Sequence, residues 1–489
     1  MSTGTREPAI ARAMRPVNSV VEKYIPSALN FAILLSVAVG LMALLLTDAG
    51  PADVLRGWGE GLAGLLAFMT QMALILLLGH ALANTRPVRR LLGALAQVPR
   101  TPLQAYVFVF LVAAAASLIT WGLGLVVGAL LARDVAAAGD RRGLELSFPM
   151  LVASGFSGFV VWHMGYSGSV PLTAATPGSF IEEQLGRTVP ITETTFSAWN
   201  LTAVVATVVL VALALWLIAP RAVDPAHRMT AAALAASEQT VTEEEVVTPA
   251  DRLDASRVPT LVVGLALAGY LVLHFAEGGT VTLDVVNWMF LGLIFLLARN
   301  PFEVMALIKN AAANVGDILL QFPLYAGIMG MMAATGLIQV LSDSVVAVAT
   351  PQTLGLLAFL SAGLVNIFVP SGGGQVAVQA PILLDAGARL DVDPAVVIMA
   401  ISYGDQWTNM IQPFWALPLL AIAGLKIRDI LGYTTVVLVV SGLVFGATLL
   451  LVGAGRGPLS PRRRAAGSTR TQGPRPRAPR WCSPGCRGS

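Results

Sequence analysis

The sequence predicts an all-α polytopic membrane protein with about nine full spans, two re-entrant hairpins and two discontinuous helices. The first observation is composition: the 489 residues are 56% hydrophobic and 12% charged, with a mean hydropathy of +0.74. A water-soluble domain of this size would not carry so apolar a surface. The second observation is a series of long apolar segments broken by short polar, glycine-rich runs. Backbone groups freed at such breaks need protein or a watery cavity as partners, so the breaks indicate a site.

Charge and cysteine content exclude other classes of protein. The formal charge of +3 is misleading, because nine arginines and no acidic residues follow Gly455; without them the chain has 22 basic and 28 acidic residues, a balance of −6. The basic balance therefore gives no reason to expect nucleic acid as a partner. Cys482 and Cys486 both lie in this tail, so no disulfide framework or cysteine metal site is expected in the body.

The N-terminal half begins with a polar segment and two spans. Spans are expected at 27–46 and 62–83, and the second is followed by Arg86, Arg89 and Arg90. Positive charge flanks the pair on both sides. The positive-inside rule therefore places the N-terminus and the 84–102 loop in the cytoplasm.

A hairpin and a discontinuous span follow. Residues 103–119 run into the polar tip 120–124, and both ends of this segment carry positive charge, which suits a hairpin that enters and leaves on the cytoplasmic side. Residues 148–176 are apolar but broken at 154–158 and 163–171, which predicts a first discontinuous span. Residues 199–219 then return to the cytoplasm.

The second half contains the stretch that organises the chain. The polar run 370–375 lies between apolar limbs at 354–369 and 376–384. At about 1.5 Å per residue the second limb covers roughly 15 Å, half of a hydrocarbon core near 30 Å thick, so it cannot cross. This pattern predicts a second hairpin with its glycine turn near the midplane.

A second discontinuous span is expected at 394–424. Its polar interruption, 403–413, suits two half-helices around an unwound centre. Three other spans precede the second hairpin, at 259–275, 281–297 and 318–337, and a last span lies near 433–452. Nine crossings place the arginine-rich tail outside, against the usual charge bias, so either the tail is translocated regardless of charge or the count is wrong by one.

The order of parts recurs in the two halves. A short amphipathic piece leads to Thr101-Pro102 in the first half and to Thr350-Pro351 in the second, and the hairpin tips begin 19 and 20 residues after the prolines. One unpaired crossing between the copies reverses the second, which predicts the inverted repeats of a secondary transporter. The expected division is a cytoplasmic N-terminal segment (1–23), a first membrane repeat (24–219), a cytoplasmic polar linker (220–257), a linking span (258–280), a second, inverted membrane repeat (281–453) and a disordered Arg- and Pro-rich tail (454–489).

The chemistry of the breaks favours a small anion. Helix N-termini that meet at the midplane present free N–H groups and positive dipole ends. The glycines at 372–374 would let an anion approach the backbone, and neither break contains lysine or arginine. We therefore expect a monovalent carboxylate, held by dipoles and neutral donors. The predicted substrate-binding residues are Ser371, Gly372, Gly373, Gly374, Gln375, Thr408, Asn409, Trp121, Gly122, Gly124, His163 and Ser167.

Asp405 is the ionisable residue placed most clearly inside a span, which makes it a functional candidate. It is expected to carry the coupling cation, either a proton or a sodium ion held by Asp405, Thr408 and Asn409. The alternative is a carboxylate that caps the half-helix starting at Gln406. His163 is either a proton relay, a substrate donor or a packing residue. Likewise Trp121, Trp162 and Trp407 either line a cavity or pack between helices.

Three stretches also resemble the bacterial short-chain fatty acid transporters, of which the acetoacetate and butyrate permease is the type member. They are Trp121-Gly-Leu-Gly-Leu-Val-Val-Gly with Ala132-Arg-Asp, the hairpin from Val369 to Pro381, and above all Gly404-Asp-Gln-Trp-Thr-Asn-Met-Ile-Gln-Pro-Phe-Trp-Ala-Leu-Pro. The resemblance covers about residues 15–453 and implies membership of the ion transporter superfamily of inverted-repeat carriers. This sequence departs from the family at Val376, where a tryptophan is usual, which affects the expected width of the cavity.

The resemblance implies uptake of acetate, butyrate, acetoacetate or a related small monocarboxylate across the bacterial cytoplasmic membrane. A carrier for another organic anion, such as a dicarboxylate, and a passive anion channel are the alternatives. An enzyme is not expected, because the sequence shows no His-Glu-x-x-His motif and no carboxylate neighbour of His163. No cofactor is expected beyond the proton or sodium. The expected partners are the substrate and the lipid bilayer, and homodimer formation is left open.

Overall fold

The computed structural model describes residues 28–220, 223, 228–229, 248–312, 315–367, 372–412, 415–416, 419–420 and 423–455. These residues form helices and turns, with no strand among them. Eight helical segments in this part of the chain are long and apolar enough to cross a membrane. The all-α, polytopic fold class is confirmed. The count of nine crossings stays a prediction, since length and composition do not separate a crossing helix from a hairpin limb.

The first half of the chain contains eleven described helical elements. They are α2 (Ala28–Leu46), α3 (Pro51–Gly61), α4 (Leu66–Ala83), α5 (Arg86–Leu95), α6 (Pro102–Ile119), α7 (Trp121–Arg141), α8 (Phe148–Ser157), the 3-10 helix η1 (Gly158–Met164), α9 (Ser169–Ala175), α10 (Phe180–Leu185) and α11 (Ala198–Ile218). The second half contains α13 (Pro249–Asp254), α14 (Val258–Ala276), α15 (Leu283–Leu297), α16 (Pro301–Ala312), α17 (Gly316–Thr335), α18 (Leu337–Val348), α19 (Leu354–Asn366), α20 (Gly372–Arg389), α21 (Pro394–Thr408) and α23 (Ile427–Gly455).

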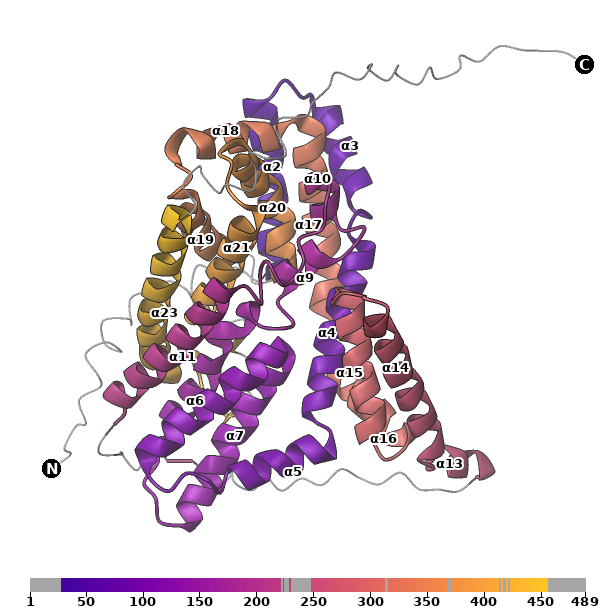
Figure 1. The fold of residues 1–489 in the computed structure, drawn as a ribbon, viewed down its shortest axis with the longest axis vertical. Helices are drawn as coiled ribbons and strands as arrows, with labels where there is room; N and C mark the ends of the chain where they lie inside the picture. The colour runs from indigo at the N-terminus through magenta and orange to yellow at the C-terminus, as the bar shows by residue number, and fades with distance from the viewer. Residues whose placement is uncertain are drawn as a thin grey trace, which may run out of the picture.

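These helices pack as two groups (Figure 1). In the scaffold group, α17 packs against α2, α3 and α4, and α15 packs against α4 and α14. In the core group, the hairpins α6–α7 and α19–α20 pack with the broken spans α8–η1–α9 and α21 and with α11 and α23. The two groups meet where α4 contacts α7 and where α17 contacts α20.

Small residues bring these helices close together. A Cβ added to Gly61 of α3 would lie 2.8 Å from the carbonyl oxygen of Ala326 in α17. In the core group, a Cβ at Gly128 of α7 would lie 2.7 Å from the carbonyl oxygen of Gly155 in α8, and a Cβ at Gly155 would lie 2.5 Å from that of Gly128. Close backbone approach of this kind drives helix association where lipid removes the hydrophobic driving force.

Both hairpins differ from their predicted limits. The first turns at a single residue, Thr120, whose backbone is extended (φ −154°, ψ 137°), and α7 already begins at Trp121. The predicted tip through Gly124 is therefore helical. In the second hairpin the glycine triplet is the first turn of α20, which continues to Arg389, so the predicted limb 376–384 is too short. Ser371 lies outside the described residues.

The two discontinuous spans are present, but their breaks are displaced. The first span is regular α-helix through Ser157, so the break predicted at 154–158 is wrong. The backbone then forms the 3-10 helix η1 and a turn at 165–168 before α9 begins. In the second span α21 continues to Thr408, and the turn starts at Asn409. Asp405 therefore lies in the last turn of α21, so the prediction that it caps a following half-helix is wrong.

The two halves share one order of elements: an amphipathic helix, a hairpin, a broken span and a closing span. Figure 1 shows the two amphipathic helices, α5 and α18, at opposite ends of the molecule, as an inverted arrangement requires. The inverted relationship and the expected division into six segments stay predictions. The segment 1–23 and residues 456–489 of the predicted tail lie outside the described residues, and α13 lies within the predicted linker.

The crossing of α7 and α8 gives the first testable prediction. Gly155→Val should destabilise the protein by about 1–3 kcal/mol, because the new side chain meets the backbone of Gly128. Gly269→Val in α14 is the matched control, since a Cβ at Gly269 meets nothing within 4 Å. Thermal unfolding of the two purified variants measures the difference. Equal melting temperatures would show that the crossing does not depend on close backbone contact.

Candidate functional site

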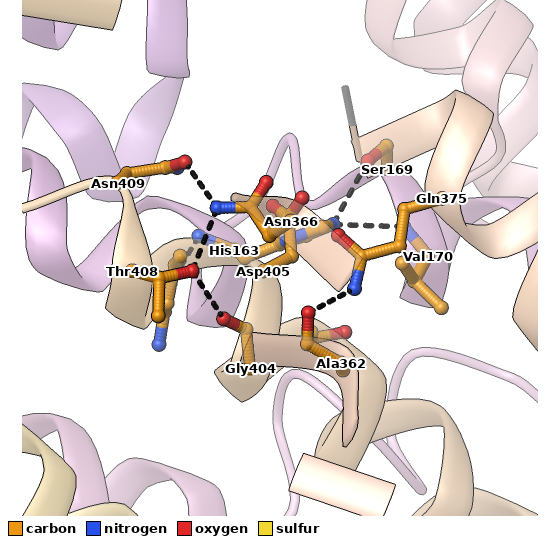
Figure 2. Close-up of polar contacts among 12 residues, drawn as sticks. His163, Ser169, Val170, Ala362, Asn366, Gln375, Gly404, Asp405, Thr408 and Asn409 are labelled. Atoms are coloured by element: carbon orange, nitrogen blue, oxygen red, sulfur yellow. Dashed lines mark hydrogen bonds and ion pairs between the residues drawn. The ribbon is translucent and has the colours of Figure 1, made fainter. Parts of the chain in front are cut away.

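The polar centre of the core group is a hydrogen bond between the two halves of the chain. His163 in η1 and Asp405 in α21 are separated by 242 residues, and their Nδ1 and Oδ2 atoms lie 2.9 Å apart. Their side chains are 0% and 1% exposed. Figure 2 shows the two side chains meeting between the broken spans. A charge this deeply buried is costly unless it is hydrogen-bonded, so this contact accounts for a carboxylate inside the helix bundle.

The protonation of His163 follows from its other neighbours. The backbone N–H of Val170 donates to Nε2 over 3.1 Å, so Nε2 must be an acceptor. Nδ1 therefore carries the ring hydrogen and donates a hydrogen bond to Asp405 Oδ2. The hydroxyl of Ser169 also lies 2.8 Å from Nε2. His163 is thus a neutral, oriented donor, and the sequence could not show this because Asp405 is remote from it along the chain.

Gln406, the residue after Asp405, makes a second contact between the halves. Its Oε1 accepts the backbone N–H of His163 over 2.9 Å. A backbone N–H can pair only with the oxygen of the amide, so the Nε2 group must point elsewhere. This Nε2 is buried and has no partner within the protein. Gln406 was not among the predicted site residues, although it lies inside the predicted break.

Thr408 and Asn409, both predicted, are joined by a residue that sequence reasoning missed. The Nδ2 group of Asn366, at the end of α19, donates to Thr408 Oγ1 over 3.0 Å and to Asn409 Oδ1 over 2.7 Å. Thr408 Oγ1 in turn donates to the Gly363 carbonyl over 2.8 Å. An amide inside the otherwise apolar limb 354–369 was the available signal. The predicted sodium set of Asp405, Thr408 and Asn409 stays a prediction, as these contacts do not test it.

Gln375 and the glycines before it position the second hairpin. Gln375 Nε2 donates over 2.8 Å to the Ala362 carbonyl, which ties α20 to α19. A Cβ at Gly372 would lie 2.6 Å from Ser169 Oγ, one at Gly373 would lie 2.7 Å from the Phe322 ring, and one at Gly374 would lie 2.5 Å from the Tyr325 ring. The triplet therefore lets α20 start in close contact with both the core group and the scaffold group. Its proposed contact with an anion stays a prediction.

The predicted residues of the first hairpin lie against the first break and the scaffold helix α4. The backbone N–H of Trp121 donates to Ser167 Oγ over 3.1 Å, which links the hairpin tip to the first break. A Cβ at Gly122 would lie 3.5 Å from the backbone nitrogen of His80 in α4, and one at Gly124 would overlap Ser117. These two glycines are explained by helix packing, and their role in binding stays a prediction.

Aromatic rings surround the His163 side of the site. Trp162 stacks on His163 with ring centroids 3.9 Å apart and on Phe159 with centroids 5.4 Å apart. Trp121 lies 6.1 Å from Trp162 and 5.2 Å from Trp415. We call these four rings, Trp121, Phe159, Trp162 and Trp415, the aromatic cluster. Trp407 is separate: its Nε1 donates to the Leu438 carbonyl over 2.7 Å, so its role is packing.

Several buried polar atoms around this centre have no hydrogen-bond partner within the protein. The acceptors are Asn366 Oδ1, Gln375 Oε1, Asp405 Oδ1 and Gln412 Oε1, and the donors are Trp121 Nε1, Trp162 Nε1, Gln406 Nε2 and Asn409 Nδ2. Each such group costs about 1–3 kcal/mol when buried without a partner. Natural proteins carry few of them, and their concentration at the hairpin tips and helix breaks points to ligands. Among the described residues, no group of three His, Cys, Asp or Glu side chains could hold a metal ion.

An all-helical membrane fold with interrupted helices, whose unpaired polar groups lie deep inside the bundle, defines a membrane transporter. A sequence model of the short chain fatty acid transporter family matches residues 9–452. The chain belongs to this family. It is a multi-pass transporter and not an enzyme, although Ser169, His163 and Asp405 form a hydrogen-bonded chain.

Two relatives carry the provisional name short-chain fatty acid transporter. The protein from Escherichia coli (strain K12) is 40% identical over 448 residues, which cover 90% of this chain and 100% of that protein. The protein from Haemophilus influenzae is 36% identical over 458 residues, covering 91% and 99%. The family model, which spans residues 9–452, covers both hairpins and both broken spans.

Two solved structures share the fold at low sequence identity. The Alcanivorax borkumensis YdaH transporter superposes with a TM-score of 0.55 and 16% identity, covering 88% of this chain and 99% of that one. Neisseria gonorrhoeae MtrF, described as illuminating a class of antimetabolite efflux pumps, superposes with a TM-score of 0.55 and 15% identity, covering 88% and 97%. The likeness concerns the fold alone.

A double-mutant cycle tests the contact between the halves. His163→Leu should lower the melting temperature more than the double variant His163→Leu/Asp405→Leu does, because the single change leaves Asp405 buried without its partner. Breaking a buried pair in this way costs about 3–5 kcal/mol, whereas removing both groups costs less. Thermal unfolding of the purified single and double variants measures the coupling. Additive effects would mean that the two side chains do not interact.

Proposed function

We propose that this protein is a secondary carrier for short-chain fatty acids and related small monocarboxylates, of the acetate, butyrate and acetoacetate class, in the bacterial cytoplasmic membrane. Family membership and the names of both relatives support this substrate class. The observation that carries the proposal is the set of buried neutral donors beside a single buried carboxylate. No lysine or arginine takes part in the hydrogen bonds described at the site. A highly charged anion would need fixed positive charge, whereas a monocarboxylate can be held by neutral donors.

Asp405 is the proposed binding residue for the coupling cation. Its Oδ2 is occupied by His163, and its Oδ1 has no partner within the protein. A substrate carboxylate at about 5 Å from an ionised Asp405 would be repelled by roughly 3 kcal/mol at an effective dielectric constant near 20. A proton or a sodium ion on Oδ1 removes this repulsion. Acid and cation would therefore load together, which is symport.

The second hairpin is the proposed moving contact between the core and scaffold groups. The start of α20 touches Ser169 of the core and Phe322 and Tyr325 of the scaffold through successive glycines. Sliding of one group past the other would change these contacts while the His163–Asp405 pair travels with the core. Motion of one part of a transporter against the other is the usual basis of alternating access.

Counterflow in proteoliposomes tests the function. Purified wild-type protein should exchange labelled butyrate for unlabelled acids of two to six carbons with saturation, and should accumulate it only under a proton or sodium gradient, while succinate competes poorly. Flux that neither saturates nor depends on a gradient would indicate a channel. Preferred transport of succinate would indicate a dicarboxylate carrier.

Asp405→Asn separates coupling from exchange. The amide keeps the size of the side chain and an oxygen for His163 Nδ1–H, but it cannot take up a proton and binds sodium weakly. Gradient-driven accumulation of butyrate should fall to the level of the external concentration, while exchange of butyrate persists. Accumulation equal to that of the wild type in the same assay would exclude Asp405 as the coupling residue.

The glycine contact with the scaffold gives a further prediction. Gly373→Val should abolish uptake while the protein still inserts, because the new side chain meets Phe322 and Phe68. Combining it with Phe322→Ala should restore part of the uptake if the obstruction is steric. Uptake by Gly373→Val at the wild-type rate would mean that close contact between α20 and the scaffold is not needed for transport.

A further inference from the structure

We propose that the substrate carboxylate is bound by side-chain N–H groups of Trp121, Trp162 and Gln406, and that the aromatic cluster holds its short alkyl chain. This inference rests on the proposed function and names the residues that recognise the substrate. It assigns the anion mainly to side chains of both halves, rather than to the backbone of the second hairpin. Trp162, Gln406, Phe159 and Trp415 thereby enter the binding site.

The direction of the Gln406 amide is fixed by the backbone. His163 N–H occupies Oε1, so the hydrogens of Nε2 must point away from this contact. The residue is 0% exposed, and Nε2 has no partner within the protein. If only the oxygen of Gln406 were needed, the cost of burying its unpaired NH₂ group would be unexplained. A bound ligand that accepts a hydrogen bond from Nε2 would remove this cost.

The indole of Trp162 is held just as firmly. It lies between the rings of Phe159 and His163, nearly parallel to both, with interplanar angles of 9° and 13°. Its side chain is 3% exposed, and Nε1 is unpaired. Since His163 bonds to Asp405, and His163 N–H bonds to Gln406, the indole and the amide belong to one hydrogen-bonded and stacked unit.

Trp121 brings a third donor from the first hairpin. Its ring contacts those of Trp162 and Trp415, it is 4% exposed, and its Nε1 is also unpaired. The hydrogen bond from its backbone to Ser167 fixes the start of α7, from which the ring projects. Buried tryptophans usually find a partner for the N–H, so two unpaired indoles in contact are unusual for simple packing.

The chemistry of this set fits a short monocarboxylate. A carboxylate accepts several N–H groups at once, and hydrogen bonds to a charged group are stronger than neutral ones. Aromatic faces and edges offer apolar contact to a few methylene groups but provide no fixed positive charge for a second carboxylate at the far end. The cluster includes Trp415, which follows the second break, so substrate contact would join rings of both halves. Each added methylene should improve affinity about fourfold until the cluster is filled.

The test uses the full-length protein in proteoliposomes and compares butyrate with butyramide, its neutral isostere, as inhibitors of labelled butyrate uptake. The wild type should prefer butyrate. Trp162→Phe keeps an aromatic ring but removes the indole N–H, and should raise the KM for butyrate about 10-fold to 100-fold with the maximal rate within about twofold. The inhibition of the Trp162→Phe variant by butyramide should differ little from that of the wild type. Gln406→Glu keeps the acceptor for His163 N–H, replaces the donor with a carboxylate, and should abolish the uptake of labelled butyrate.

Trp199→Phe is the matched control. The Trp199 indole N–H also lacks a partner, but its ring packs 6.3 Å from Tyr403 and outside the aromatic cluster, so KM should stay within about twofold of the wild type. If Trp162→Phe weakens the binding of butyrate and of butyramide equally, the substitution has only distorted the site, and the inference is overturned. An unchanged KM for butyrate in Trp162→Phe would overturn it as well. If the wild type itself does not transport butyrate, the proposed function fails first, which distinguishes the two outcomes.

Discussion

The hydrogen bond from His163 to Asp405 is the contact on which the remaining site depends. It offsets part of the cost of a carboxylate at 1% exposure without supplying a fixed positive charge. Because Val170 N–H occupies the other ring nitrogen, the imidazole has one orientation and one proton. That leaves Asp405 Oδ1 without a partner, while Gln406 bonds to the backbone of His163 and Trp162 stacks on its ring. A lysine in place of His163 would satisfy the carboxylate permanently and remove the reason for a coupling cation.

Unpaired polar groups at the centre and close-packed glycines around it have the same physical origin. Lipid offers no hydrogen bonds, so a broken helix must be surrounded by protein, and protein can surround it closely only where side chains are absent. Gly128 against Gly155 brings α7 to the first broken span, and Gly372 brings the second hairpin to Ser169. The glycines thus serve the enclosure of the site. The orphaned donors and acceptors inside are what a small ion and a small acid can complete.

Much of the fold could be read from the sequence, since long apolar segments, their interruptions and the recurring Thr-Pro landmarks are local patterns. The limits of the breaks could not be predicted from the sequence, because residues 121–124 and 372–374 are held in helices by tertiary packing that overrides the weak helix propensity of glycine. Asp405 and His163 were both found as lone ionisable residues in apolar surroundings. Their pairing could not be found from the sequence, because the fold brings together two positions that are 242 residues apart. Asn366 and Gln406 became visible only through their partners.

The most direct test of the account is to locate a bound substrate analogue. Diffraction at the bromine edge from crystals of the full-length protein with (E)-5-bromopent-4-enoate, whose vinyl bromide resists displacement, would place the halogen by its anomalous signal once competition with butyrate has been shown. We expect one strong peak against the rings of Trp121, Phe159, Trp162 and Trp415, with the carboxylate density turned toward Gln406. A peak on the lipid-facing surface, or one confined to the scaffold helices α3, α14 and α15, would contradict it.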